Sequence, residues 1–276
     1  MMNEANNDRG QKPMGEPVDA APRSNRRRKA PEPIEELFKP SFSIFVGRGS
    51  TGKTTVARWV CDRAQRPVLV YDGDADHIGL QRFVDGAMVT ASADDIDVRQ
   101  GFEDLIDRHL EERIDVVIDL GGGDRVFPTL AYHLDLHTFL VEEGSKPAIF
   151  YLAGPDPADL ALLTELEADG LFAPERTGIL FNEHLIPRHM PDRVFKDIVG
   201  RDEVLQRAIK RGAQVARIPR LETADRILEA GVSFQYAVKG CALVDGLPLS
   251  PTQRQQTRRW LERLHQSMEP MLDWLP

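Results

Sequence analysis

Short runs of apolar residues alternate along the chain with segments whose apolar residues recur at helical spacing. Runs of about four to eight apolar residues are typical of strands buried on both faces, because such runs present no polar side to water. They lie at residues 41–46, 67–71, 114–120, 148–152, 178–182 and 214–218. Helices are predicted for residues 54–64, 101–113, 128–141, 192–210, 221–230 and 251–274, and one more helix opens at Asp156. This alternation predicts an α/β fold, a three-layer sandwich with helices on both faces of a mostly parallel, twisted sheet.

A glycine-bearing loop follows the first predicted strand and leads directly into the first predicted helix. Residues 47–54 fit the pattern G-x-x-x-x-G-K-[ST], which is typical of a P-loop that binds nucleotide phosphates. Glycine lets backbone N–H groups come close to an anion, and the start of a helix presents unpaired N–H groups and a positive dipole end. We expect Lys53 to reach the β- and γ-phosphates and the Thr54 hydroxyl to ligate Mg²⁺. The predicted nucleotide contacts from this loop are Gly47, Gly49, Ser50, Thr51, Gly52, Lys53, Thr54 and Thr55.

Carboxylates follow two further predicted strands. Asp72, Asp74 and Asp76 come at alternating positions after the second strand, and Asp119 ends the third. Such side chains can ligate Mg²⁺, hold its waters or orient an attacking water, whereas aspartates that cap a polar turn are the structural alternative. Asp119 can hold a Mg²⁺-bound water, and the glycines after it, through Gly123, let backbone N–H groups approach a γ-phosphate.

The strand ends bring these scattered segments to one edge of the predicted sheet. In such folds ligands bind at the carboxyl ends of the strands. The P-loop, the aspartates and Asn182, which ends a later strand, all fall at such ends. The Asn182 carboxamide can pair with a base edge because it is both donor and acceptor, although a simple turn asparagine is the alternative.

Composition narrows the class of protein. The chain has 276 residues, of which 41% are hydrophobic, enough for one large α/β domain or two small ones. Its formal net charge is −9, so any nucleic-acid binding would have to be local. The two cysteines form no metal-type spacing, and no apolar run approaches the length of a membrane span. The polar start lacks the apolar region of a signal peptide, and we expect the protein to be cytoplasmic.

The two ends of the chain suggest surface contacts. Residues 1–38 are predicted to be a disordered arm, and residues 39–276 a single domain that includes a long final helix. A basic run at residues 23–29 could touch DNA or an acidic lipid surface, or it could serve only to keep the arm soluble. The final helix carries an apolar stripe with arginines elsewhere, which suits a membrane or partner helix, or a helix packed on its own domain.

Five motifs, in their order along residues 41–239, resemble the ParA/MinD family of deviant-Walker ATPases, within the group that includes the CobQ/CbiA proteins. They read GRGSTGKTT, VLVYDGDADH, VVIDLGGGD, GILFN and ARIPRLETADRILEAG. The resemblance implies a P-loop NTPase fold that holds ATP with Mg²⁺ between two subunits. It also implies that Lys53 and Asp74 are catalytic, with Asp74 orienting the attacking water. The remaining implied roles are Mg²⁺ binding by Thr54, Asp72 and Asp119, phosphate contact at Gly123, adenine recognition by Asn182 and a base-lining position at Pro219.

Three departures from the family pattern concern the same site. Arg48 stands where the family has a lysine that reaches the partner's phosphates, and Ser50 stands where it has a glycine. Arginine is a planar fork of donors rather than a compact point charge, so Arg48 could act as an arginine finger or face solvent. Asp74-Ala75-Asp76 replaces the usual Asp-Pro-Gln. GTP is less favoured than ATP, because the sequence has no Asn-Lys-x-Asp segment to bind guanine.

We therefore expect a nucleotide-switched ATPase that hydrolyses slowly without a partner and positions a DNA or protein cargo. Within the ParA/MinD family, the chain is expected to be a plasmid partition protein or a TraL-like conjugal-transfer protein. The expected partners are a second copy in a nucleotide-dependent homodimer and a protein activator or cargo adaptor. An ATP-dependent small-molecule ligase or kinase of the CbiA/dethiobiotin-synthetase type and a non-hydrolysing, nucleotide-bound scaffold are the alternatives, since fold and motif do not fix function.

Overall fold

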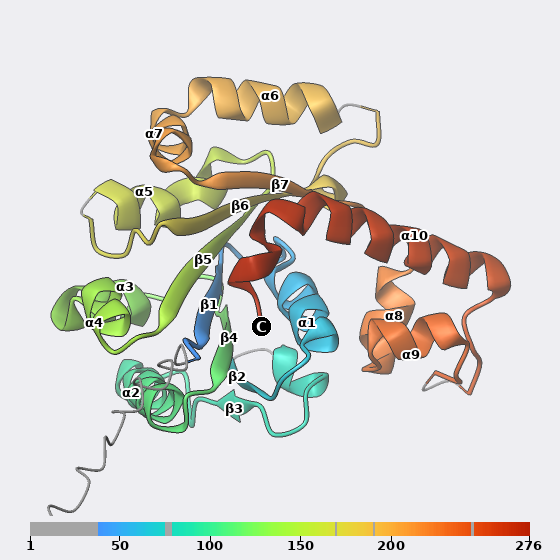
Figure 1. The fold of residues 1–276 in the computed structure, drawn as a ribbon. Helices are drawn as coiled ribbons and strands as arrows, with labels where there is room; N and C mark the ends of the chain where they lie inside the picture. The colour runs from blue at the N-terminus through green and yellow to red at the C-terminus, as the bar shows by residue number, and fades with distance from the viewer. Residues whose placement is uncertain (1–37, 75–78, 169, 190, 244–245) are drawn as a thin grey trace, which may run out of the picture. The chain divides into compact units, whose positions relative to one another are not determined.

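A parallel sheet forms the centre of the structure, with strand order β3-β2-β4-β1-β5-β6-β7 (Figure 1). The computed structural model describes residues 38–74, 79–168, 170–189, 191–243 and 246–276. Its strands are β1 Ser41–Val46, β2 Val68–Gly73, β3 Met88–Val89, β4 Asp115–Leu120, β5 Lys146–Ala153, β6 Arg176–Asn182 and β7 Gln214–Ile218. Each pair of neighbouring strands is parallel. The α/β prediction is confirmed, and the short edge strand β3 is an addition to it.

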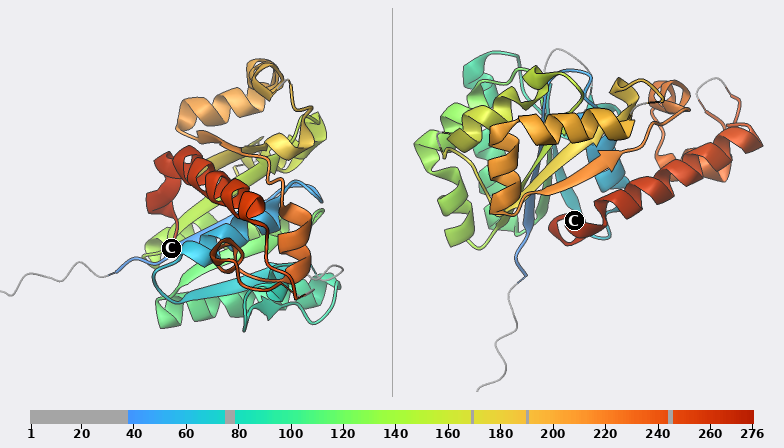
Figure 2. Two further views of the ribbon diagram at one scale, coloured as in Figure 1. Left: turned by 90° about the vertical axis from the view of Figure 1, so that its right-hand side faces the viewer. Right: turned by 90° about the horizontal axis from the view of Figure 1, so that it is seen from above.

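Helices cover both faces of this sheet (Figure 1; Figure 2). One face packs against α1 Lys53–Arg63, α8 Ala224–Ala230, α9 Phe234–Lys239 and α10 Pro251–Met268. The other packs against α2 Asp95–Glu112, α3 Val126–Leu134, α4 Leu136–Glu142, α5 Ala161–Ala168, α6 Pro191–Arg201 and α7 Glu203–Arg211. Short 3₁₀ helices lie at η1 Leu80–Arg82, η2 Pro157–Leu160, η3 Glu183–Leu185 and η4 Glu269–Trp274. Residues 38–276 form one compact unit.

The central strands are largely apolar because helices bury both of their sides. In β1 every residue is buried, with Phe42, Ile44 and Val46 in the core on the α2–α7 face and Phe45 in the core on the α1 face. Phe45 stacks on Phe150 of β5 with ring centroids 4.8 Å apart. β1 thus lies between β4 and β5 with no solvated side, and its C-terminal end is a fixed base for the loop that follows.

Two predicted helices are each split in the structure. Residues 128–141 divide into α3 and α4 at Asp135, whose φ of 43° breaks the helical path. Residues 192–210 divide into α6 and α7 at Asp202, whose side chain accepts a hydrogen bond from the Leu205 N–H. Aspartate competes for backbone donors and so favours helix starts over helix interiors, which apolar periodicity does not register.

The final helix packs on its own domain. The apolar residues Trp260, Leu264 and Met268 of α10 are buried in the core shared with α1 and β7. Its arginines have local partners, including Arg259 with Glu262 and Arg263 with Glu183. No helix in the described part of the chain is long and apolar enough to cross a membrane. The predicted arm with its basic run, and Asp76, lie outside the described residues, and the roles suggested for them stay predictions.

Candidate nucleotide site

The P-loop connects the end of β1 to the start of α1 in a conformation that needs glycine at its two ends. Gly47 has a φ of 146° and Gly52 a φ of 100°. A Cβ atom at Gly52 would lie 2.6 Å from Nδ2 of Asn182, and one at Gly47 would lie 2.5 Å from the Leu152 carbonyl oxygen. The first and last glycines of the motif are therefore required by the packing of neighbouring strands around the loop.

Ser50 occupies the position where the family pattern has glycine, and its backbone is left-handed, with a φ of 63°. This region costs a residue with a side chain about 1–2 kcal/mol. Serine in place of glycine therefore adopts the left-handed conformation at an energetic cost, and contacts around the loop must hold Ser50 in it.

The Lys53 ammonium group lies inside the loop. Its Nζ donates to the Arg48 carbonyl oxygen at 3.0 Å, and the Thr51 hydroxyl donates to the same oxygen at 2.7 Å. Lys53 is buried, and burial lowers the pKa of its amine, while the negative charges of Asp119 and Asp74 oppose that shift. The ammonium group is therefore poised beside two carboxylates in the cleft above the loop.

The Thr54 hydroxyl and Asp119 form the second element of the site. Thr54 Oγ1 donates to Asp119 Oδ2 at 2.5 Å, while Oδ1 of the same buried carboxylate has no hydrogen-bond partner among the described residues. Burial raises the pKa of Asp119 to about 7, against the lowering effects of Thr54 and Lys53. An unpartnered, dehydrated carboxylate oxygen beside a threonine hydroxyl fits Mg²⁺ and its waters.

The Asp72 carboxylate accepts hydrogen bonds from the backbone of the turn after β2. Its Oδ2 accepts a hydrogen bond from the Gln81 N–H at 2.9 Å and its Oδ1 one from the Asp74 N–H at 3.3 Å. The carboxylate is buried and does not line the cleft. These hydrogen bonds shape the turn after β2, and the role of Asp72 as an Mg²⁺ ligand stays a prediction. No group of three or more His, Cys, Asp or Glu side chains placed to hold a metal ion is present in the described ranges.

Asp74 lies between two clefts. It lines the cleft above the P-loop, of about 310 Å³, and a second one of about 460 Å³ that continues past the loop after β4. Gly123, with a φ of 113°, lines the second cleft, and a Cβ atom at Gly122 would lie 2.5 Å from the Gly49 nitrogen. The loop after β4 therefore packs directly on the P-loop, with Asp74 beside both.

The far end of the first cleft is an apolar slot. Its lining comes from Ile218, Pro219, Leu221, Ala224, Leu228 and Trp260, with Asp225 and His184 as polar neighbours. Trp260 of α10 donates its indole N–H to the Pro219 carbonyl oxygen at 2.7 Å. Pro219 was predicted at this place, whereas Trp260 and Leu228 were not, because their apolar periodicity is equally typical of core residues.

Asn182 connects this slot to the P-loop. Its Nδ2 donates to the Thr51 carbonyl oxygen at 2.9 Å, and its Oδ1 accepts from the His184 N–H at 2.9 Å. The carboxamide oxygen and one amide hydrogen thus bond to the protein backbone, so Asn182 stabilises the P-loop. Recognition of adenine by the second amide hydrogen stays a prediction.

We expect Asn182→Ala to lower the free energy of unfolding by about 1–3 kcal/mol, because the Thr51 carbonyl and the His184 N–H lose their partner. Urea unfolding measures this change, and Asn182→Asp is the companion variant, since it keeps the acceptor for His184 and loses the donor to Thr51. A value for Asn182→Ala within experimental error of the unmodified protein would contradict the bracing role.

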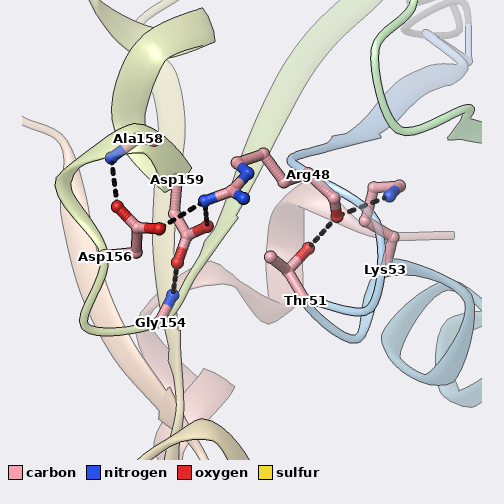
Figure 3. Close-up of polar contacts among 7 residues, drawn as sticks. All are labelled: Arg48, Thr51, Lys53, Gly154, Asp156, Ala158 and Asp159. Atoms are coloured by element: carbon pink, nitrogen blue, oxygen red, sulfur yellow. Dashed lines mark hydrogen bonds and ion pairs between the residues drawn. The ribbon is translucent and has the colours of Figure 1, made fainter.

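Arg48 lines neither cleft. Its side chain instead makes ion pairs with Asp156 and Asp159 (Figure 3). Its Nη1 lies 2.6 Å from Asp156 Oδ2 and 3.2 Å from Asp159 Oδ1. The Arg48 side chain is about half exposed, and the arginine-finger role, in which it would reach the partner's phosphates, stays a prediction. The predicted P-loop residues, Asp74, Asp119, Gly123, Asn182 and Pro219 meet at one edge of the sheet, and the Asp72 carboxylate and the Arg48 side chain turn away.

The fold is α/β, with a loop that fits the P-loop motif between β1 and α1. No family model and no curated relative matches the chain. Among solved structures, FtsY from Mycoplasma mycoides is similar at 14% identity and a TM-score of 0.36, and the match covers 52% of each chain. A GTPase in its apo form from Pyrococcus abyssi is similar at 15% identity and a TM-score of 0.39, over 65% of this chain and 90% of that one. This chain thus spans about half the length of FtsY, and likeness at this level indicates nothing about what it binds.

Proposed function

We propose that this protein binds ATP with Mg²⁺ in the cleft above the P-loop and hydrolyses it slowly, as a nucleotide-switched ATPase of ParA/MinD type. The observation that carries the proposal is one cleft that joins Lys53, Thr54, Asp74 and Asp119 to an apolar slot ending at Trp260. Cationic, hydroxyl and carboxylate groups lie at the end that suits phosphates, and apolar side chains lie at the end that suits a base.

Each group has a chemical task in this proposal. Lys53 and the N–H groups at the start of α1 bind phosphate oxygens, and Asp74 orients a water for attack on the terminal phosphate. The Thr54 hydroxyl ligates Mg²⁺ directly, and Asp119 holds one of its waters. Mg²⁺, when bound, neutralises phosphate charge. Slow turnover fits a site in which Asp74 is the single predicted water-orienting residue.

ATP is proposed over GTP because the slot is largely apolar and the sequence has no Asn-Lys-x-Asp segment. Asp225 is the one feature of the slot that would favour GTP, since a carboxylate there can accept hydrogen bonds from the N–H groups of guanine. Calorimetric titration with ATP·Mg²⁺ and GTP·Mg²⁺ should show ATP binding at least about tenfold more tightly. Tighter binding of GTP would overturn the choice of base and leave the P-loop site in place.

The switch function rests on the motif resemblance. It includes a nucleotide-dependent homodimer in the cytoplasm that positions plasmid DNA, a conjugation apparatus or another large assembly with the help of a protein adaptor. A DNA contact through residues 23–29 belongs to the same proposal, because the net charge of −9 leaves a local basic run as the site for such a contact.

A small-molecule ligase or kinase is the second candidate, and the second cleft favours it. That cleft adjoins Asp74 and is lined by Asp95, Asp124 and Arg125, so a polar substrate placed there would meet the terminal phosphate. ATP consumption that depends strictly on a small carboxylic acid would promote this candidate. The scaffold alternative predicts tight ATP binding with no phosphate release even when partners are present.

Light scattering tests the switch directly. We expect a doubling of mass with a slowly hydrolysed ATP analogue and Mg²⁺, and a monomer with ADP·Mg²⁺ or without nucleotide. The control is the Lys196→Ala variant, which changes an exposed lysine on α6 and should behave like the unmodified protein. A monomer under all conditions, with ATP binding confirmed by calorimetry, would contradict the homodimer and favour the two alternatives.

A further inference from the structure

Two carboxylates on the loop after β5 receive the Arg48 guanidinium group (Figure 3). Asp156 is the N-cap of η2, and Asp159 lies within that 3₁₀ helix. The Asp159 side chain is only 7% exposed, whereas the Arg48 and Asp156 side chains are about half exposed. Exposed ion pairs contribute little by themselves, so the buried member of this group indicates a more specific role.

Backbone donors orient both carboxylates toward Arg48. The Gly154 N–H donates to Asp159 Oδ2 at 2.8 Å, which leaves Oδ1 for the guanidinium. The Ala158 N–H donates to Asp156 Oδ1 at 2.9 Å, which leaves Oδ2. The Ala158 N–H and then Arg48 hold the pKa of Asp156 below its usual range, in keeping with an ionised partner. The two acids therefore form a receptor whose geometry is fixed by the backbone.

The other end of the same residue organises the P-loop. The Arg48 carbonyl oxygen accepts from Lys53 Nζ at 3.0 Å, from the Thr51 hydroxyl at 2.7 Å and from the Thr51 N–H at 3.4 Å. Three donors thus converge on one carbonyl. Figure 3 draws the Thr51 hydroxyl and the Lys53 ammonium group, which is expected to meet phosphate. A rotation of the peptide after Arg48 would move all three.

The loop needs such support because its own conformation is unfavourable. Gly47, Ser50 and Gly52 all have positive φ, and glycine-bearing loops lose much conformational entropy when they become ordered. β5, which bears the receptor, pairs with β1, which bears the loop, through Val46 and Tyr151. The ion pairs therefore connect the ends of two neighbouring strands. They start from Arg48, the second residue of the P-loop.

We propose that Asp159, assisted by Asp156, is a positioning residue that acts through Arg48 to hold the P-loop and Lys53 ready for phosphate. The inference rests on the proposed nucleotide site and adds residues that the P-loop motif does not contain. Pre-organisation of this kind increases affinity because less ordering remains to be done on binding. In this arrangement Arg48 serves its own subunit through both its side chain and its carbonyl.

The first experiment measures the Kd for ATP·Mg²⁺ by calorimetry for three variants. Asp159→Asn keeps an acceptor for Gly154 and loses the charge, and we expect Kd to rise about tenfold. Arg48→Ala should give a similar rise, and Arg48→Ala combined with Asp159→Asn should be no worse than Arg48→Ala alone, because both changes break one bridge. Glu103→Gln, which removes a carboxylate from the exposed Arg99–Glu103 pair on α2, is the control and should leave Kd unchanged.

The second experiment needs no nucleotide. An amine-reactive acylating reagent should modify Lys53 several-fold faster in Asp159→Asn than in the unmodified protein, as followed by mass spectrometry. The two proteins should have the same melting temperature. A Kd within twofold of the unmodified protein together with unchanged Lys53 acylation would overturn the positioning role, as would independent, multiplying effects of the two substitutions. If the unmodified protein binds no nucleotide, the proposed function fails, and the acylation rates still decide whether the bridge positions Lys53.

Discussion

Replacing Lys53 by alanine should abolish measurable ATP binding, with a loss of at least about a hundredfold in affinity. The ammonium group is buried, lies within hydrogen-bond distance of the Arg48 carbonyl, and is placed in the cleft with Thr54 and Asp119. Its removal leaves two or three phosphate charges without their nearest cation in a partly dehydrated site, where electrostatic interactions are strong. Calorimetric titration of the variant with ATP·Mg²⁺ measures the effect directly.

The same substitution should change the fold little. Lys53 carries a desolvation cost in the nucleotide-free protein, which is the main reason that its pKa is lowered. Its loss therefore removes an unfavourable contribution along with the hydrogen bond to Arg48, and we expect a melting temperature within a few degrees of the unmodified protein. Lys196→Ala on the exposed side of α6 is the matched control. An unchanged affinity in Lys53→Ala would refute the assignment of this cleft to nucleotide.

The sheet could be predicted because its central strands are buried on both faces. Helix packing on both sides favours apolar residues, so β1, β4 and β5 appear in the sequence as largely apolar runs. The two-residue strand β3 gives no such signal. The break at Asp202 was missed because a single capping side chain, not periodicity, decides where α7 begins.

The P-loop end of the cleft was easier to find from the sequence than its apolar end, for a similar reason. P-loop residues such as Gly52 and Lys53 have tasks that only a few residue types can perform, and their spacing is fixed by one loop. Trp260 lies 41 residues after Pro219, to which it donates its indole N–H, and nothing local marks it as more than a core residue. Sequence indicates where a chemically restricted loop lies, while contacts across elements depend on tertiary packing.

The positions of Asp72 and Arg48 show what motif reasoning leaves open. An aspartate after a strand can ligate a metal or cap a turn, and the N–H groups of Gln81 and Asp74 that donate to Asp72 are seen only in the folded chain. Likewise the arginine in place of the family lysine gains its meaning from Asp156 and Asp159, more than 100 residues away. Both outcomes follow from where backbone donors and buried acids lie, which is a property of the folded chain.

Asp119 supports a prediction in which stability and function change in opposite directions. Burial raises its pKa to about 7 in the folded, metal-free protein, whereas the unfolded chain has the ordinary value of about 3.9. Between about pH 4 and pH 7 the folded state therefore keeps a proton that the unfolded state has released. Stability decreases as pH rises wherever the folded state binds more protons than the unfolded state. The contribution of Asp119 to the free energy of unfolding therefore decreases from about pH 4 to pH 7, and its destabilising effect is complete above pH 7.

Asp119→Asn removes this titration and keeps an acceptor for the Thr54 hydroxyl. In the presence of a chelator we expect the variant to be more stable than the unmodified protein at pH 8, by an amount on the order of a few kcal/mol, and the difference should vanish near pH 4. Urea unfolding at several pH values measures it. Asp104→Asn on the exposed side of α2 is the control and should show no such pH-dependent gain.

The same variant should lose Mg²⁺-dependent ATP hydrolysis by about a hundredfold or more, because a neutral carboxamide no longer attracts a Mg²⁺-bound water. A buried carboxylate that destabilises its own fold at neutral pH is explained if it holds a cation in the working protein. Thus Asp119→Asn with greater stability and lost hydrolysis would identify Asp119 as part of the Mg²⁺ site. A variant with reduced stability at pH 8 and retained hydrolysis would instead mean that Asp119 serves the fold through Thr54.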